Sequence, residues 1–227
     1  MMRLIGHALL TCFLLLLALA TLEFVSHANS LGWSGLGGGA RDSRLISPHQ
    51  VANFGIFLHM VTGAVITVLA PLQLVPILRR KWPVVHRWSG RVLVVFAFVT
   101  GCGGLAYIAL HGTIGGPRMS VAFAIYGFLV LICALQTIRF ARTRNWVAHQ
   151  DWALRMFFLA IGSWLYRVHY AIWAPLTDRA GMARDFSGSF DQFNLWAFYV
   201  PYLVLLECVL AAKARGIFRS SQRSITL

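Results

Sequence analysis

Apolar runs dominate this chain and constrain its fold more than any other feature. Crossing a hydrocarbon core about 30 Å thick takes ~20 helical residues. Six segments are long enough, and with their expected helical flanks they cover residues 4–25, 51–78, 83–110, 119–138, 146–173 and 193–212. The sequence therefore predicts an all-α, polytopic membrane helical bundle with six transmembrane helices, in which residues 1–227 form a single integral membrane domain.

The composition supports a membrane protein and excludes a nucleic-acid-binding one. Hydrophobic residues make up 58% of the chain and charged residues 12%, whereas an average soluble domain has about 25% charged residues. The net charge of +13 could attract nucleic acid, but the basic residues fall between apolar segments and form no continuous stripe. We expect the lipid bilayer as partner, a membrane protein as a candidate partner, and no nucleic acid.

The basic residues divide unequally between the two sides of such a bundle. One side would carry Arg3, Arg79, Arg80, Lys81, Arg87, Arg91, Arg139, Arg142, Arg144, Lys213, Arg215, Arg219 and Arg223. The other would carry Arg41, Arg44, Arg118, Arg179 and Arg184. Because cytoplasmic loops carry the excess of Lys and Arg, this distribution predicts a multi-pass protein with both termini in the cytoplasm.

The first apolar run allows two interpretations. Arg3, the following apolar stretch and the small residues Ser26 and Ala28 resemble a secretory signal peptide with its cleavage site. The run extends to Val25, longer than a usual signal core, so we favour an uncleaved anchor. Cleavage would leave five helices with unchanged orientation.

Two histidines lie at matching depth near the cytoplasmic side. Pro83 suits the first turn of a helix, and Asn145 is a plausible N-cap, so His86 and His149 each fall about one turn into their helices. Two imidazoles from parallel helices could ligate haem iron or another transition metal. Arg87, Arg91 and Arg155 would then lie near the propionates of the haem. These three arginines are close to the two histidines in sequence.

A second pair of histidines lies toward the outer side. His59 is nine residues into the second predicted helix, ~13 Å along its axis, and His169 is about one turn from the end of the fifth. Gly55 and Gly63 flank His59 on one helical face, where the groove would admit a flat ring or a neighbouring helix. His59 and His169 are the second candidate pair of metal ligands.

The fifth predicted helix also carries two arginines inside the membrane, Arg155 and Arg167. An ionisable residue within a span is costly and by default indicates a functional site. Each arginine could instead extend toward the nearer interface, bind an anion, or pair with an acid. The carboxylates available within the apolar runs are Glu23 and Glu207, and the sequence leaves their pairing open.

Together these residues resemble a bacterial family of predicted membrane proteins, the domain of unknown function twenty-three-oh-six. The matching features are His59 with Gly63, residues 71–74, residues 86–91, His149 with Trp152 and Arg155, and Arg167. The resemblance implies a bacterial inner-membrane location and no particular activity. A looser likeness to dihaem cytochromes b, which carry histidines at two depths of their core helices, implies a redox function.

Three functions follow as hypotheses. The first is an uncharacterised accessory or structural component of the inner membrane with a polar His/Arg site inside the bundle. The second is a redox protein with haem b ligated by two histidines; a single haem at His86 and His149 is favoured, because His149 and His169 are ~30 Å apart along one helix. The third is a small-solute or ion-coupled transporter that uses His59, Arg155, Arg167 and His169. No hydrolase or transferase motif is recognisable in the sequence.

Overall fold

The computed structural model describes residues 2–39 and 45–225, and for residues 2–5, 7 and 217–225 it describes the backbone alone. Arg41 and Arg44 lie outside the described residues. Within this part of the chain there are ten helices and no strand. They are α1 (Met2–Ala20), α2 (Leu22–Leu36), α3 (Gln50–Leu74), α4 (Pro76–Lys81), α5 (Pro83–His111), α6 (Gly116–Arg142), α7 (Trp146–Ala160), α8 (Gly162–Thr177), α9 (Ser189–Ala197) and α10 (Val200–Ile225).

Five helical stretches of the described chain are long and apolar enough to cross a membrane. They are Ala8–Leu36, Gln50–Leu74, Pro83–His111, Gly116–Arg142 and Ser189–Gly216. The all-α class and the membrane location are thereby confirmed. The predicted fifth span, residues 146–173, is not among the five, because it is divided at Ile161 into α7 and α8. This segment carries four of the predicted site residues, His149, Arg155, Arg167 and His169.

Local sequence signals explain where several helices begin. The Asn145 side chain accepts a hydrogen bond from the backbone N–H of Ala148 at 3.1 Å, so the predicted N-cap of α7 is confirmed. Pro83 is in the first turn of α5, also as predicted. The run 51–78 ends early as a helix, because Val75 is extended and Pro76 starts the short helix α4.

The glycine-rich stretch after the first apolar run differs from its predicted structure. Its composition suggests a flexible connection from Asn29 onward, yet α2 continues as a helix to Leu36. A Cβ atom on Gly32 would lie 2.6 Å from Val61 and 2.8 Å from the Phe57 carbonyl oxygen, and one on Gly35 would overlap the Phe57 ring. These glycines allow α2 to pack closely on α3, as small residues do in membrane helix pairs.

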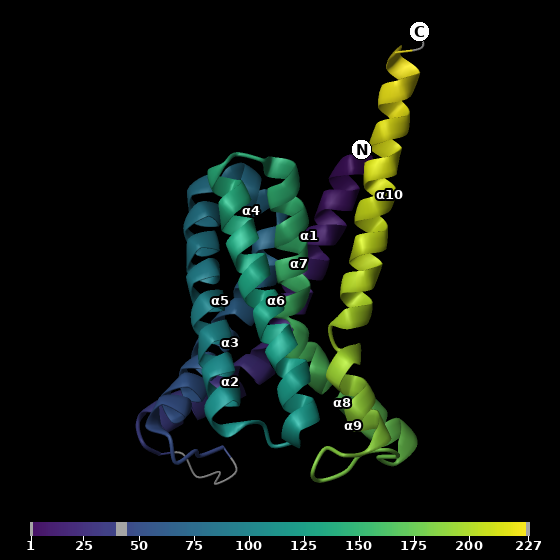
Figure 1. Ribbon diagram of the computed structural model, residues 1–227. Coiled ribbons are helices and arrows are strands. Elements are labelled where there is room, and N and C mark those ends of the chain that lie inside the picture. The colour runs from purple at the N-terminus through teal and green to yellow at the C-terminus, as the bar shows by residue number, and fades with distance from the viewer. Residues whose placement is uncertain (1, 40–44, 226–227) are drawn as a thin grey trace.

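The centre of the molecule is a ring of four helices. α3 contacts α5, α5 contacts α6, α6 contacts α7, and α7 contacts α3, so α5 and α7 are diagonal to each other. Core side chains inside this ring include Ala97, Ala134, Met156 and Leu159, each at most 2% exposed. α1 and α2 contact α3, α10 contacts α7, and α8 and α9 lie beyond the C-terminal end of α7 (Figure 1).

The chain ends and the basic turns lie at one end of the bundle (Figure 1). The N-terminus, α4 and the α6–α7 turn are at this end, and the C-terminal part of α10 projects beyond it. The start of α3, the connection between α5 and α6 and the connection between α8 and α9 are at the opposite end. We call the first end the basic end and the second the opposite end.

The break between α7 and α8 frees backbone groups inside the bundle. The Leu159 carbonyl accepts the Tyr126 hydroxyl, and the Ala160 carbonyl accepts the Thr67 hydroxyl at 3.1 Å. Side chains of α6 and α3 therefore replace helical hydrogen bonds at this point, which the absence of water in a bilayer core requires. The break redirects α8 away from the four-helix ring toward α9 (Figure 1).

Candidate functional site

His149 is held in one orientation at the basic end of the ring. Its Nδ1 lies 3.0 Å from the backbone carbonyl oxygen of Thr137 on α6. Because a carbonyl can only accept, Nδ1 carries the proton and Nε2 keeps a free lone pair in the neutral ring. This arrangement is common for metal-binding histidines, whose second nitrogen often donates to a backbone carbonyl.

His86 is held differently, through Gln73 of α3. In the orientation that satisfies both of its ends, the Gln73 amide nitrogen donates to His86 Nδ1 at 2.9 Å, and its oxygen accepts from the Ser89 hydroxyl at 2.6 Å. The proton of the neutral ring is then on Nε2. Metal ligation through Nε2 would require this proton to leave and the Gln73 amide to turn.

The two histidines share the mouth of the ring at the basic end. They project from the diagonal helices α5 and α7. Both rings are half-buried, whereas Arg87 and Arg91 are exposed. The Arg91 guanidinium lies over the Trp88 ring, 4.7 Å from its centroid.

Arg155 is engaged by a carboxylate. Its Nε and Nη2 donate to the two carboxylate oxygens of Glu207 at 2.6 and 2.8 Å, and its guanidinium lies 4.6 Å from the Trp152 ring centroid. One turn closer to the basic end, Asp151 faces Lys213 at 3.6 Å. Two ion pairs therefore connect α7 to α10, and the first occupies the arginine predicted to lie near a haem propionate.

His59 lies in the close contact between α3 and α5. Its Nδ1 is 2.8 Å from the Thr100 carbonyl oxygen, which leaves Nε2 with the free lone pair in the neutral ring. A Cβ atom on Gly55 would lie 2.8 Å from the Gly103 carbonyl oxygen. The groove beside His59 is therefore filled at Gly55 by a neighbouring helix, one of the two occupants that the sequence allowed.

His169 has both ring nitrogens engaged. Nδ1 lies 2.6 Å from the amide oxygen of Asn194 on α9, and Nε2 lies 2.9 Å from the Tyr202 hydroxyl on α10. The Asn194 amide nitrogen donates to the Tyr166 carbonyl at 3.1 Å. His169 thus connects α8 to α9 and α10, and metal ligation would require Asn194 or Tyr202 to move.

Arg167 has an exposed side chain near the start of α8. Its Nη1 donates to the Ser163 carbonyl at 2.9 Å, and its guanidinium lies over the Phe24 ring of α2, 4.6 Å from the centroid. No carboxylate of the described residues is within ion-pair distance.

No hydrogen bond or ion pair joins the predicted site residues to one another within the described part of the chain. His59 and His169 bond to different helices, and Arg155 pairs with α10 while Arg167 contacts α2. Among residues 2–39 and 45–225 there is no group of three or more His, Cys, Asp or Glu side chains placed to hold a metal ion. A site with two histidine ligands would not form such a group.

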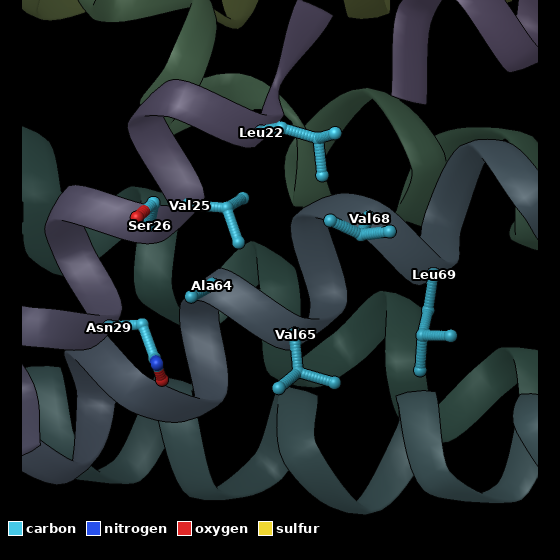
Figure 2. A pocket seen from close by; sticks show the side chains of 8 residues that line it. All are labelled: Leu22, Val25, Ser26, Asn29, Ala64, Val65, Val68 and Leu69. Carbon is cyan, nitrogen blue, oxygen red and sulfur yellow. The ribbon is translucent and has the colours of Figure 1, made fainter. Parts of the chain in front are cut away.

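A groove of about 500 Å³ lies between α2 and α3. Leu22, Val25, Ser26 and Asn29 line it from α2, and four residues from Ala64 to Leu69 line it from α3 (Figure 2). Its lining is mostly apolar and includes none of the predicted site residues.

A buried carboxylate that the sequence did not single out organises the opposite end. Asp191 is 1% exposed; its oxygens accept from the Tyr170 hydroxyl and from the backbone N–H groups of Ala183 and Gly188. These contacts attach the α8–α9 connection to the helix ends. In the same connection Asp185 accepts two hydrogen bonds, from the Ser187 hydroxyl and from the Ser187 backbone N–H. These bonds, chiefly the one from the hydroxyl, hold the pKa of Asp185 below its usual value.

Neither Asn194 nor Asp191 was singled out from the sequence as a functional residue. The signal in the sequence was an asparagine inside an apolar helix, because an amide in a membrane requires hydrogen-bond partners. In the structure Asn194 is 0% exposed. The sequence indicates that Gln73 bonds backbone groups freed by Pro71 and Pro76, but the structure places its amide against His86 and Ser89 on α5.

Comparisons with known proteins give one positive finding. No curated protein and no solved structure matches the chain. The model of a family described as predicted membrane protein, domain of unknown function 2306, matches residues 56–210, from the second turn of α3 to the middle of α10. Since this match covers more than half of the sequence, the chain belongs to that family of predicted membrane proteins.

Proposed function

We propose that this protein is an accessory or structural component of the bacterial inner membrane, with six spans and both termini in the cytoplasm. In this arrangement α7 and α8 together form the fifth span, and the basic end faces the cytoplasm. The polar His/Arg residues then hold the bundle together and present a site at its cytoplasmic end.

The observation that carries this proposal is the bidentate pair between Arg155 and Glu207. An intramembrane arginine satisfied by a carboxylate of another helix serves to join those helices. His169 supports the same interpretation, because its two nitrogens connect α8 to α9 and α10. Arg155 and His169, which the sequence placed among the candidate cofactor-binding and metal-binding residues, thus make contacts between helices.

Purification from native membranes tests the accessory function. A tagged full-length chain is expected to recover a membrane-protein partner at fixed stoichiometry in two different detergents. The loss of that partner on Arg155→Leu, with the chain still present in the membrane, would tie the interaction to the α7–α10 unit. Recovery of the chain without a stoichiometric partner in either detergent would contradict the proposal.

Haem binding is a second candidate function, and one observation favours it. His86 and His149 project from diagonal helices of a four-helix ring, and the Thr137 carbonyl leaves Nε2 of His149 free for a metal. In this candidate His149 and His86 would hold haem b, with Arg87 and Arg91 near the propionates. The bound haem would supply one-electron redox chemistry.

Absorbance spectroscopy tests the haem candidate. The purified chain, produced with ample haem, is expected to show a Soret band that is lost in His86→Ala and His149→Ala. His27→Ala is the matched control, since His27 is exposed on α2 and should leave the band unchanged. A colourless preparation would contradict haem binding and leave the accessory function standing.

A further inference from the structure

Two opposite charges, on α8 and α2, have no ion-pair partner among the described residues. Arg167 on α8 and Glu23 on α2 both have exposed side chains, and neither takes part in an ion pair within residues 2–39 and 45–225. Glu207, the other carboxylate inside an apolar run, is already bound by Arg155. In a bilayer such exposed charges face acyl chains, where an unpaired charge is unfavourable.

The Arg167 guanidinium is held away from the nearer interface. The oxygen that it bonds belongs to Ser163, one turn closer to the α7–α8 break. An arginine extending toward the opposite end would point away from that break. Its contact with Phe24 fixes the guanidinium beside the first turn of α2 instead.

Glu23 lies at nearly the same depth as that guanidinium. It immediately precedes Phe24, and successive helical residues differ by only ~1.5 Å in rise. Glu23 is also in the first turn of α2, where the positive end of the helix dipole favours a carboxylate. Arg167 and Glu23 therefore lie on contacting helices, near the first turn of α2, and form no ion pair with each other.

We propose that the surface where α8 meets the first turn of α2 is a dimer interface. In this dimer, Arg167 of each copy pairs with Glu23 of the other copy. A two-fold axis along the membrane normal keeps the orientation and the depth of every residue. Arg167 of one copy can therefore meet Glu23 of the other at the same depth. The two-fold symmetry then places Glu23 of the first copy against Arg167 of the second. Exposed apolar side chains next to Glu23, Leu19 at 59% and Leu22 at 47%, would be covered by the same contact.

Charge-reversal variants test the proposal. Mixing two complementary variants distinguishes an ion pair between copies from an ion pair within one copy. Full-length protein carrying donor or acceptor fluorophores at its C-terminus is reconstituted in phosphatidylethanolamine–phosphatidylglycerol vesicles, and energy transfer is measured against the protein-to-lipid ratio. Arg167→Glu alone and Glu23→Arg alone place like charges opposite each other. Each should weaken dimerisation at least about tenfold.

A mixture of the two variants should restore energy transfer close to that of the unchanged protein. One copy then carries two glutamates and the other two arginines, so both ion pairs form between copies and neither can form within one. Arg118→Glu, an exposed arginine at the start of α6, is the charge control and should dimerise normally.

Several results would overturn the proposal. They are an unchanged protein that stays monomeric at every density, single variants that dimerise normally, and a mixture no better than its components. If only the double reversal within one chain restores thermal stability, the pair is intramolecular and the proposal is wrong. Should a charge reversal fail to accumulate, Arg167→Gln and Glu23→Gln are expected to show the same loss of energy transfer, and normal transfer in both would overturn the proposal.

Discussion

A histidine ring has two nitrogens, and its neighbours decide which one can bind a ligand. Backbone carbonyls of Thr100 and Thr137 engage Nδ1 of His59 and His149, so Nε2 is free in both. His169 differs because Asn194 and Tyr202 engage both of its nitrogens. Residues of one type, all inside apolar helices, therefore have different chemical capacities in this molecule.

The Arg155–Glu207 pair supports a prediction at the scale of residues. Although Glu207 is 52% exposed, that surface faces lipid in the proposed arrangement, so water screens the pair weakly. A double-mutant cycle with Arg155→Leu and Glu207→Leu should give a coupling free energy of about 1–3 kcal/mol. Reversible unfolding in bicelles measures it, and additive single effects would show that the pair does not contribute.

Close helix packing depends on glycine in this fold. The α2–α3 contact requires Gly32 and Gly35, and the α3–α5 contact requires Gly55 and Gly103. Each contact brings backbone atoms so near that a methyl group would overlap a carbonyl oxygen or a ring. Dispersion contacts replace the hydrophobic driving force that is absent between helices in lipid.

Gly32→Ala tests this packing at the scale of helices. The added methyl group would meet Val61 and the Phe57 carbonyl oxygen, so we expect a destabilisation of about 1–3 kcal/mol despite the better helix propensity of alanine. Gly6→Ala is the matched control, because no atom lies within 4 Å of its added Cβ. Thermal unfolding in detergent should separate the two variants, and equal midpoints would argue against the contact.

The whole molecule has one strongly basic end, and this asymmetry predicts its orientation. Arg79, Arg80, Lys81, Arg139 and Arg142 surround the turns at the basic end, where the chain termini also lie (Figure 1). Such residues are retained in the cytoplasm during insertion. The opposite end should face the periplasm.

Reporter fusions measure that orientation. Alkaline phosphatase inserted after residue 38 or 182 should be active, because it folds in the periplasm, and a fusion after residue 143 should be inactive. The same experiment tests the proposed fifth span, since positions 143 and 182 lie on opposite sides only if α7 and α8 together cross the membrane. Equal activity at these two positions would contradict six spans.

The sequence predicted the fold better than the site. The N-cap at Asn145 and the helix start at Pro83 depend on neighbouring residues, and both were identified. The helix through Gly32 and Gly35 was missed, since its stability comes from α3 rather than from its own composition. Similarly, Glu207 and Glu23 were both candidates for Arg155, and nothing within one helix could choose between them.

The membrane class and the places of the apolar helices follow from the sequence alone, because the transfer of ~20 consecutive side chains into hydrocarbon is a property of that segment. Tertiary structure decided the rest. It selected Glu207 as the partner of Arg155, attached His169 to α9 and α10, and placed Arg167 over Phe24 instead of in an ion pair with Glu23. Such pairings depend on the rotation and tilt of packed helices, which contacts between distant segments determine.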